Sequence, residues 1–147
     1  MGNICRSPAA EGIFHQLVEE AGLSAQISCD SAGTIGYHSG GRADSRMRAA
    51  AAGRGYSLDS ISRQVRAADF NEFDHIIAMD HENMAVLQQL AGIHPGKARL
   101  SMMCDYATRH REEEVPDPYY GGDRGFERVL DILEDACAGL LDKLSAQ

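Results

Sequence analysis

The sequence predicts one α/β domain over residues 1–147, built on a small doubly wound parallel sheet flanked by helices. Three observations support this fold class. Segments with helical spacing of apolar residues alternate with short apolar runs of strand length, and glycine-rich loops separate them. The length suits a single core, and no internal repeat is visible. The predicted order is loop–α–β–α–β–α–β–loop–α.

Five segments have the patterns of helices. The first is predicted over residues 8–21, with Ser7 as its N-cap and Pro8 at the first helical position, where a missing N–H costs little. Its apolar residues share one face, and Gly22 ends it. The last helix, over about residues 125–144, carries a broad apolar face. Between these two, helices are expected over 44–52, 66–70 and 82–91.

Three segments have the patterns of strands. Residues 26–30 alternate between polar and apolar side chains. Residues 74–80, DHIIAMD, hold an apolar run between acids, which is typical of a buried parallel strand. A weaker strand is expected over 99–103. The polar stretch from 104 to 123 is long for a connection inside a compact domain, which indicates a functional loop.

The charge and composition exclude several classes of protein. There are 22 acidic and 14 basic residues, and the net charge of −8 argues against bulk nucleic-acid binding. No apolar run is long enough to span a membrane, and the first dozen residues hold no apolar leader, so we expect a cytoplasmic protein. The four cysteines lack C-x-x-C spacing and the six histidines lack paired spacing, so we expect no metal and no cofactor.

The opening residues, MGNICRSPAAEG, have the composition of a phosphate-binding loop that runs into a helix. Consecutive backbone N–H groups of a turned loop bind an anion, and the N-terminal end of the helix adds partial positive charge. Glycine permits backbone turns closed to other residues, and the guanidinium of arginine can hold two phosphate oxygens. We expect phosphate to bind at Gly2, Asn3, Ile4, Cys5 and Arg6.

Further motifs follow in the chain: DSAGT at 30–34, YHSGGRADSR at 37–46, FDHIIAMD at 73–80 and VPDPYY at 115–120. Together with the opening loop, they resemble the low-molecular-weight protein tyrosine phosphatases, whose loop reads C-x-G-N-x-C-R-S-P. The resemblance covers the whole chain in order and spacing. It implies a four-stranded parallel sheet, of which three strands are present in this chain while the family's first, central strand is missing.

The resemblance places the nucleophilic cysteine one position before Met1. Cys5 cannot replace it by register, because six residues after it stands Glu11 and not an arginine. One interpretation is a clipped phosphatase, with a cysteine directly upstream after an apolar strand of about five residues. The other is a non-catalytic phosphate-binding relic. We favour the first, since losing a central strand exposes the apolar edges of its neighbours. The chain as written is expected to be nearly inactive.

The resemblance assigns catalytic roles to three residues. Arg6 would hold the phosphate, and Ser7 would donate a hydrogen bond to the cysteine sulfur and ease its departure. Asp117, in VPDPYY, would protonate the leaving phenolate and then act as the base toward water. Without the opening loop, an aspartate before a proline would simply indicate a turn.

Other positions would support the loop or line the substrate cleft. Asn3 matches the residue that braces the loop, with Ser31 as its expected partner, and Asp80 could form an ion pair with Arg6. An aromatic cleft would admit phosphotyrosine, whereas phosphoserine would be too short to reach the loop. The residues that match the cleft walls are Tyr37, Tyr119 and Tyr120.

Two other enzymes of the same fold remain as alternatives. Arsenate reductase shares the loop but needs further redox cysteines, and Cys104 stands alone in its region. A related branch that acts on phosphoarginine tends to carry threonine where this chain has Ile4, and it lacks the double tyrosine. The expected partners are therefore phosphotyrosine proteins as substrates and a second copy in a weak homodimer, with no nucleic acid and no membrane span.

Overall fold

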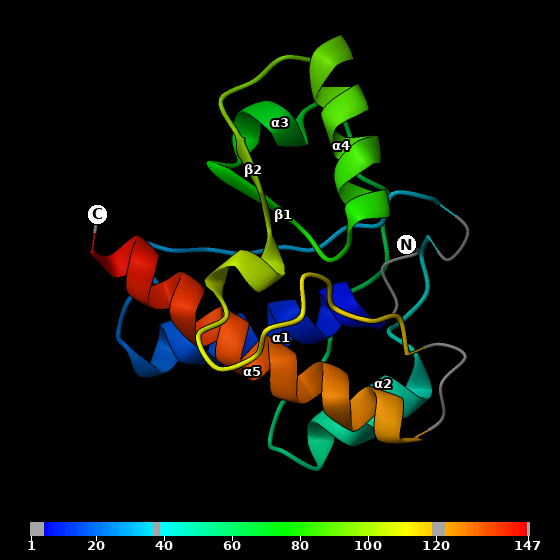
Figure 1. Ribbon diagram of the computed structural model, residues 1–147, viewed down its shortest axis with the longest axis vertical. Coiled ribbons are helices and arrows are strands. Elements are labelled where there is room, and N and C mark those ends of the chain that lie inside the picture. Colours follow the sequence, from blue (N-terminus) through cyan, green and yellow to red (C-terminus); the bar gives the residue numbers. More distant parts are fainter. Residues whose placement is uncertain (1–4, 37–38, 119–122, 147) are drawn as a thin grey trace.

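The computed structural model describes residues 5–36, 39–118 and 123–146 (Figure 1). They form an α/β fold with a small parallel sheet, which confirms the predicted fold class. Within these ranges, no helix combines the length and the apolar character that crossing a bilayer requires. The elements are, in chain order, α1 (Arg6–Glu20), α2 (Ser45–Ala52), α3 (Asp69–Glu72), β1 (His75–Ala78), α4 (His81–Ile93), β2 (Arg99–Met102), the 3-10 helix η1 (Met103–Tyr106) and α5 (Asp123–Ser145).

Helices α1 and α5 pack against each other and form most of the larger core, with α2 beside them (Figure 1). The apolar face predicted on the last helix is buried except for Leu141, which is half-buried, and Ile13 of α1 lies in the same cluster. Each such side chain contributes about 1.5–3 kcal/mol when it is removed from water. This helix pair is therefore the platform on which the site is built. The buried stripe of α5 consists of Phe126, Val129, Leu130, Leu133, Cys137 and Leu140.

Strands β1 and β2 pair in parallel, with His75 opposite Arg99 and Ala78 opposite Met102. Helix α4 connects them, so the three elements form a βαβ unit. This unit and α3 lie above the α1–α5 pair in Figure 1 and have a separate, smaller core. The buried residues of that core are Phe70, Ala78, Leu87 and Met102.

The prediction of a strand over residues 26–30 is wrong, because the described sheet has two strands and not three. The segment is extended in Figure 1, and its burial alternates: Ile27 and Cys29 pack on the larger core, while Ser28 and Asp30 are exposed. A strand also needs a hydrogen-bonded neighbour. Among the described residues, this stretch of chain pairs only through an isolated bridge between Gly33 and Gln64.

The predicted start of the first helix, with Ser7 as its N-cap, is also wrong. Helix α1 begins at Arg6, so Ser7 lies inside it and is not its N-cap. Cys5 occupies the N-cap position, and among the described residues no side chain caps the first turn. The first N–H groups of a helix have no partner inside the helix, and an anion site at a helix N-terminus uses these groups.

Candidate active site

Arg6 is buried at the first residue of α1, with only 5% of its surface exposed. Its Nη1 donates to Asp80 Oδ2 and to the carbonyl oxygen of Val115, both at 2.8 Å. The guanidinium thus joins α1, the end of the β1 segment and the loop before α5, and the expected pair with Asp80 is confirmed. No hydrogen bond within the described ranges uses Nε or Nη2. These two donors form the flat fork that binds an oxyanion.

Asp80 holds the guanidinium in one orientation. Its Oδ1 accepts from the N–H of Asn83 at 2.7 Å and so caps α4, while Oδ2 accepts from Arg6. Burial alone would raise the pKa of Asp80, but the Asn83 N–H and the Arg6 guanidinium outweigh it and keep the pKa below its usual range. Asp80 is therefore ionised at neutral pH, and the buried arginine has the paired charge that it needs.

The loop that carries Asp117 is tied to the end of β1 and the start of α4. Val115 N donates to the carbonyl oxygen of Met79 at 2.8 Å, and His81 N donates to Glu114 Oε2 at 2.7 Å. Asp117 is exposed two residues after Val115, whose carbonyl binds Arg6. These contacts bring Asp117 to the N-terminal end of α1.

Asp135 of α5 anchors the beginning of the same loop. Its buried carboxylate accepts from the N–H groups of Thr108, Arg109 and His110, from the Thr108 hydroxyl, and from the His110 ring. Burial would raise the pKa of Asp135, but the hydrogen bonds outweigh it and hold the pKa far below its usual range. The largest of these lowering effects come from the backbone N–H groups of His110, Arg109 and Thr108. The loop is therefore fastened at both ends, at Asp135 and at Arg6.

Cys5 is beside Arg6 but is poorly suited to be a nucleophile. Burial raises the pKa of the Cys5 thiol to about 12, and the negative charges of Asp44 and Asp117 add to the effect. Such a thiol holds almost no thiolate at neutral pH. The charge of Asp117 acts on Cys5, which is consistent with a position near the start of α1.

The structure brings Cys5, Arg6, Ser7 and Asp117 to one end of α1. Ser31 lies on the neighbouring extended segment, where its hydroxyl donates to Glu11 Oε1. In the described part of the chain, no three histidine, cysteine or acidic side chains are grouped so that they could hold a metal ion. Six predicted site residues lie outside the described ranges: Gly2, Asn3, Ile4, Tyr37, Tyr119 and Tyr120.

Sequence reasoning missed two residues that shape this site, Asp135 and Asp44. Asp44 caps α2 by accepting from the N–H groups of Arg46 and Met47, and its charge reaches Cys5. An aspartate before a helix indicates a cap but not what else it faces. In the sequence, Asp135 looks like an ordinary acidic residue of an amphipathic helix. Its role could not be predicted, because its hydrogen-bond partners lie 25–27 residues away.

Residues 1–147 match the model of the low molecular weight phosphotyrosine protein phosphatases. A low molecular weight protein-tyrosine-phosphatase of Streptomyces coelicolor is 42% identical over 148 residues, which cover 99% of this chain and 90% of that relative. A crystal structure of a protein tyrosine phosphatase from Entamoeba histolytica superposes with a TM-score of 0.93 at 49% identity, covering 99% and 93% of the two chains. A Drosophila arginine phosphatase superposes with a TM-score of 0.91 at 30% identity, covering 98% and 92%. The chain belongs to the low molecular weight phosphotyrosine protein phosphatase family.

Proposed function

We propose that this phosphatase hydrolyses phosphotyrosine in proteins through a phosphocysteine intermediate, with Arg6, Ser7 and Asp117 as its catalytic residues. The observation that carries the proposal is the buried guanidinium of Arg6. Its Nη1 donates to Asp80 and Val115, and no described residue accepts from Nε or Nη2, so these two donors would bind an oxyanion. The N-terminus of α1, which no described side chain caps, supports the same site, because its N–H groups add donors and partial positive charge.

The nucleophile in this proposal is a cysteine directly before Met1, six positions ahead of Arg6. Backbone N–H groups and Arg6 would lower its pKa from about 8.5 to between about 3.5 and 7.5. Its thiolate attacks phosphorus in line, and the S–P bond forms as the bond from phosphorus to the phenolic oxygen breaks. Asp117 gives its proton to that oxygen.

In the second half of the reaction, water attacks phosphorus and the S–P bond breaks. Asp117, now a carboxylate, accepts a proton from the water. Ser7 donates a hydrogen bond to the departing sulfur. Arg6 holds the equatorial oxygens in both halves, so no metal ion is required to balance the charge.

Specificity for phosphotyrosine would come from Tyr37, Tyr119 and Tyr120. Aromatic contacts contribute about 0.5–1.5 kcal/mol each beyond the area they bury, which is around tenfold in affinity. The rest of the preference would come from reach, since the phosphate must arrive at the loop while the ring fills the cleft. Asp117 lies only two residues before Tyr119, so the general acid and the cleft wall would share one loop.

The test uses the chain extended before Met1 by an apolar strand of about five residues and a cysteine. We expect turnover without added metal and a higher kcat/KM on a phosphotyrosine peptide than on matched phosphoserine and phosphoarginine peptides. Tyr119→Ala and Tyr120→Ala should reduce that preference. The extended chain with serine in place of the new cysteine is the control and should be inactive. An active serine control would refute the phosphocysteine route.

A phosphoarginine phosphatase is the second candidate, favoured by the similarity to the Drosophila arginine phosphatase. The fold does not separate the two substrates, because the tyrosine phosphatase of Entamoeba superposes almost equally well. Equal kcat/KM values on phosphoarginine and phosphotyrosine peptides would move the chain to that branch. Arsenate reduction gains no support, since it needs further redox cysteines and Cys104 stands alone in its region.

We also propose that the protein works in the reducing cytoplasm, where cysteines remain thiols. All four cysteines are free, which supports this location. A weak homodimer is a further expectation, and among the described residues the exposed large apolar side chains are Ile35, Ile61 and Ile93. Cell fractionation would test the location. Sedimentation over a range of protein concentrations would test the homodimer.

A further inference from the structure

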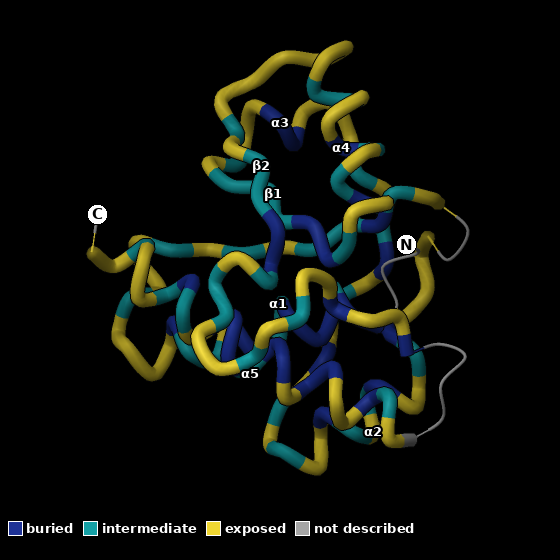
Figure 2. The backbone as a smooth tube through the Cα atoms, viewed as in Figure 1, coloured by how far each residue is buried: buried dark blue, intermediate teal, exposed yellow. Residues whose placement is uncertain are grey.

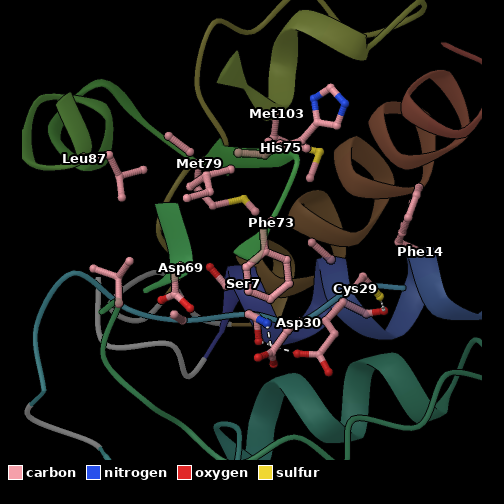
Figure 3. Close-up of a pocket in the computed structure, with 18 of the residues that line it drawn as sticks. Ser7, Phe14, Cys29, Asp30, Asp69, Phe73, His75, Met79, Leu87 and Met103 are labelled. Carbon is pink, nitrogen blue, oxygen red and sulfur yellow. Dashed lines mark hydrogen bonds between the residues drawn. The ribbon is translucent and has the colours of Figure 1, made fainter. Parts of the chain in front are cut away.

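The largest cavity in the described structure lies beside α1 but does not contain Arg6. It has a volume of about 520 Å³, and Ser7, Phe14 and Cys29 are among the residues that line it (Figure 3). Neither Cys5 nor Arg6 is part of its lining. The phosphate site of the proposed function therefore lies outside this cavity.

The charges near the first turn of α1 come from more than Arg6. Burial is the largest cause of the raised pKa of Cys5, and the negative charges of Asp44 and Asp117 raise it further. The positive charge of Arg46 acts in the opposite direction. All three charges reach the residue next to Arg6, which is consistent with the contact between α1 and α2.

The start of α2 is fixed in the same core as Cys5. Ala43 and Met47, on either side of Asp44, are buried and belong to the apolar cluster that includes Cys5. Figure 2 shows buried stretches of chain where α2 meets the neighbouring helices. Only 11% of the Asp44 side chain is exposed, so solvent and salt screen its charge less than they screen a surface carboxylate.

Arg46 binds both oxygens of the Asp44 carboxylate. Its Nε donates to Oδ1 at 3.2 Å and its Nη2 donates to Oδ2 at 3.1 Å, while Oδ1 also accepts from the N–H groups of Arg46 and Met47. Burial would raise the pKa of Asp44, but the Arg46 side chain and then the two N–H groups outweigh it and keep the pKa below its usual range. Asp44 is therefore ionised at neutral pH.

A contact with α5 holds the same guanidinium in place. The Cζ atom of Arg46 lies 4.9 Å from the centre of the Phe126 ring, which is buried in the first turn of α5. An arginine over an aromatic face is attracted by the ring. Figure 1 shows α2 against this part of α5, the helix that follows the loop of Asp117. Arg46 is thus fixed between two helices and keeps its position on Asp44.

A phosphate dianion at Arg6 would meet these charges. A phosphate monoester carries about −1.5 to −2 charges at pH 7. Asp80 already offsets the charge of Arg6 through a contact of 2.8 Å. An unopposed carboxylate of Asp44 would add repulsion, whereas the Asp44–Arg46 pair has no net charge.

We propose that Arg46 is a positioning residue for phosphate binding: its guanidinium holds Asp44 and cancels its charge, so that the start of α1 accepts a phosphate dianion. This role rests on the proposed function, because phosphate must bind at Arg6 for the charge of Asp44 to oppose it. Arg46 acts through Asp44 and not by touching the phosphate. A lysine, which keeps the charge but not the fork, should therefore replace it in part.

The first experiment titrates the 147-residue chain with inorganic phosphate at pH 7 and follows the amide signals of Arg6 and Ser7 by NMR. At an ionic strength of about 0.1 M, Arg46→Met should raise the dissociation constant about three- to tenfold, and Arg46→Lys should raise it less. Asp44→Asn keeps a good helix cap but removes the negative charge, so it should lower the dissociation constant. The double variant should return to within about twofold of the unmodified chain.

The opposite signs separate charge from packing, because damage to the packing would weaken phosphate binding in both single variants. Raising the ionic strength to about 1 M should reduce both effects to less than about twofold, since the Debye length falls to about 3 Å.

Lys143→Met is the matched control. Lys143 also lies over an aromatic ring, at 5.5 Å from the centre of Tyr106, but about 30 Å along α5 from the start of that helix. Its replacement changes the net charge by the same amount and should alter the dissociation constant less than about twofold.

The outcomes distinguish this role from the proposed function. If the unmodified chain does not bind phosphate at about 50 mM, the phosphate site at Arg6 fails and the role of Arg46 fails with it. If phosphate binds but the two single variants shift the dissociation constant in the same direction, or not at all, only the role of Arg46 is overturned. If Arg46→Met does not fold, Asp44→Asn decides, and a dissociation constant that does not fall overturns the role.

Discussion

At the scale of single residues, the site depends on how Arg6 divides its donors. Nη1 donates to Asp80 and Val115, and no described residue accepts from Nε or Nη2, the two donors that we propose bind phosphate. A lysine would offer a compact ammonium in place of the planar fork, and it could not make both sets of contacts. The structural and chemical roles of this residue are therefore inseparable.

We expect Arg6→Lys in the cysteine-extended enzyme to reduce kcat/KM on p-nitrophenyl phosphate by roughly 10²–10³-fold, the usual cost of losing a donor to transition-state charge. Asp80→Asn is the matched variant, because it removes the orienting charge but keeps the fork, and its loss should be clearly smaller. Steady-state kinetics on both variants measure the difference. Near-normal activity of Arg6→Lys would exclude direct contact with phosphate.

Asp117→Asn should affect poor leaving groups more than good ones. An acid contributes most when the leaving oxygen is strongly basic, and such catalysis is typically worth about 10²–10⁴-fold. A series of aryl phosphates with phenols of rising pKa would measure this, with single-turnover formation of the phosphocysteine as the readout. A uniform loss across the series would remove Asp117 from the role of general acid.

At the scale of elements, the loop from 107 to 118 is ordered by contacts to its neighbours and not by its own sequence. Asp135 of α5 holds its beginning through three backbone N–H groups, and Arg6 of α1 holds Val115 near its end. Between them, Arg128 of α5 reaches Glu112 at 3.1 Å. The position of Asp117 therefore depends on the packing of α1 against α5.

We expect Asp135→Asn to lower the free energy of unfolding at pH 7 by about 2–4 kcal/mol, because a buried charged acceptor of several hydrogen bonds is lost. The folded-state pKa of Asp135 is depressed, so its contribution is fully present above the unfolded value of about 3.9 and is lost as pH falls below it. Urea denaturation at several pH values would show the gap between the two proteins shrinking below about pH 4.

Asp142→Asn is the control for this prediction. Asp142 lies on the exposed side of the same helix, so its replacement should change the free energy of unfolding by less than about 0.5 kcal/mol. A gap between Asp135→Asn and the unmodified protein that stays constant down to pH 3 would show that the charge of Asp135 does not stabilise the loop.

At the scale of the whole molecule, two cores meet across a cavity. The α1–α5 core and the smaller core between the sheet and α4 each bury their own residues, while the segment 26–34 and β1 face each other without pairing.

We expect the 147-residue chain alone to hydrolyse p-nitrophenyl phosphate about 10⁶-fold more slowly than the cysteine-extended enzyme, which is the usual scale for removing a nucleophile. Cys5 does not compensate, because its pKa of about 12 leaves almost no thiolate at neutral pH. Initial rates at equal protein concentration measure the ratio, with Cys5→Ser as the control. A rate for the short chain that is ordinary for an enzyme would refute the assigned loop register.

The sequence by itself determined the features that local chemistry controls. Apolar periodicity located the helices and the two strands to within a few residues. The family resemblance, through the opening loop and VPDPYY, supplied Arg6, Ser7 and Asp117 as candidate catalytic residues. The sequence also indicated that 26–30 is extended, because alternation is a property of the segment alone. The boundary at Ser7 was wrong because an uncapped helix start has no local signature.

The tertiary structure alone decided which segments have partners. Residues 26–30 have the pattern of a strand but no described neighbour to pair with, and pairing depends on chain far away in sequence. The anchoring of residues 108–110 by Asp135 and the orientation of Arg6 by Asp80 join positions 25–74 residues apart. Such contacts form only when α1, α5 and the βαβ unit have packed, since burial is what makes these charged hydrogen bonds strong and leaves them a single geometry.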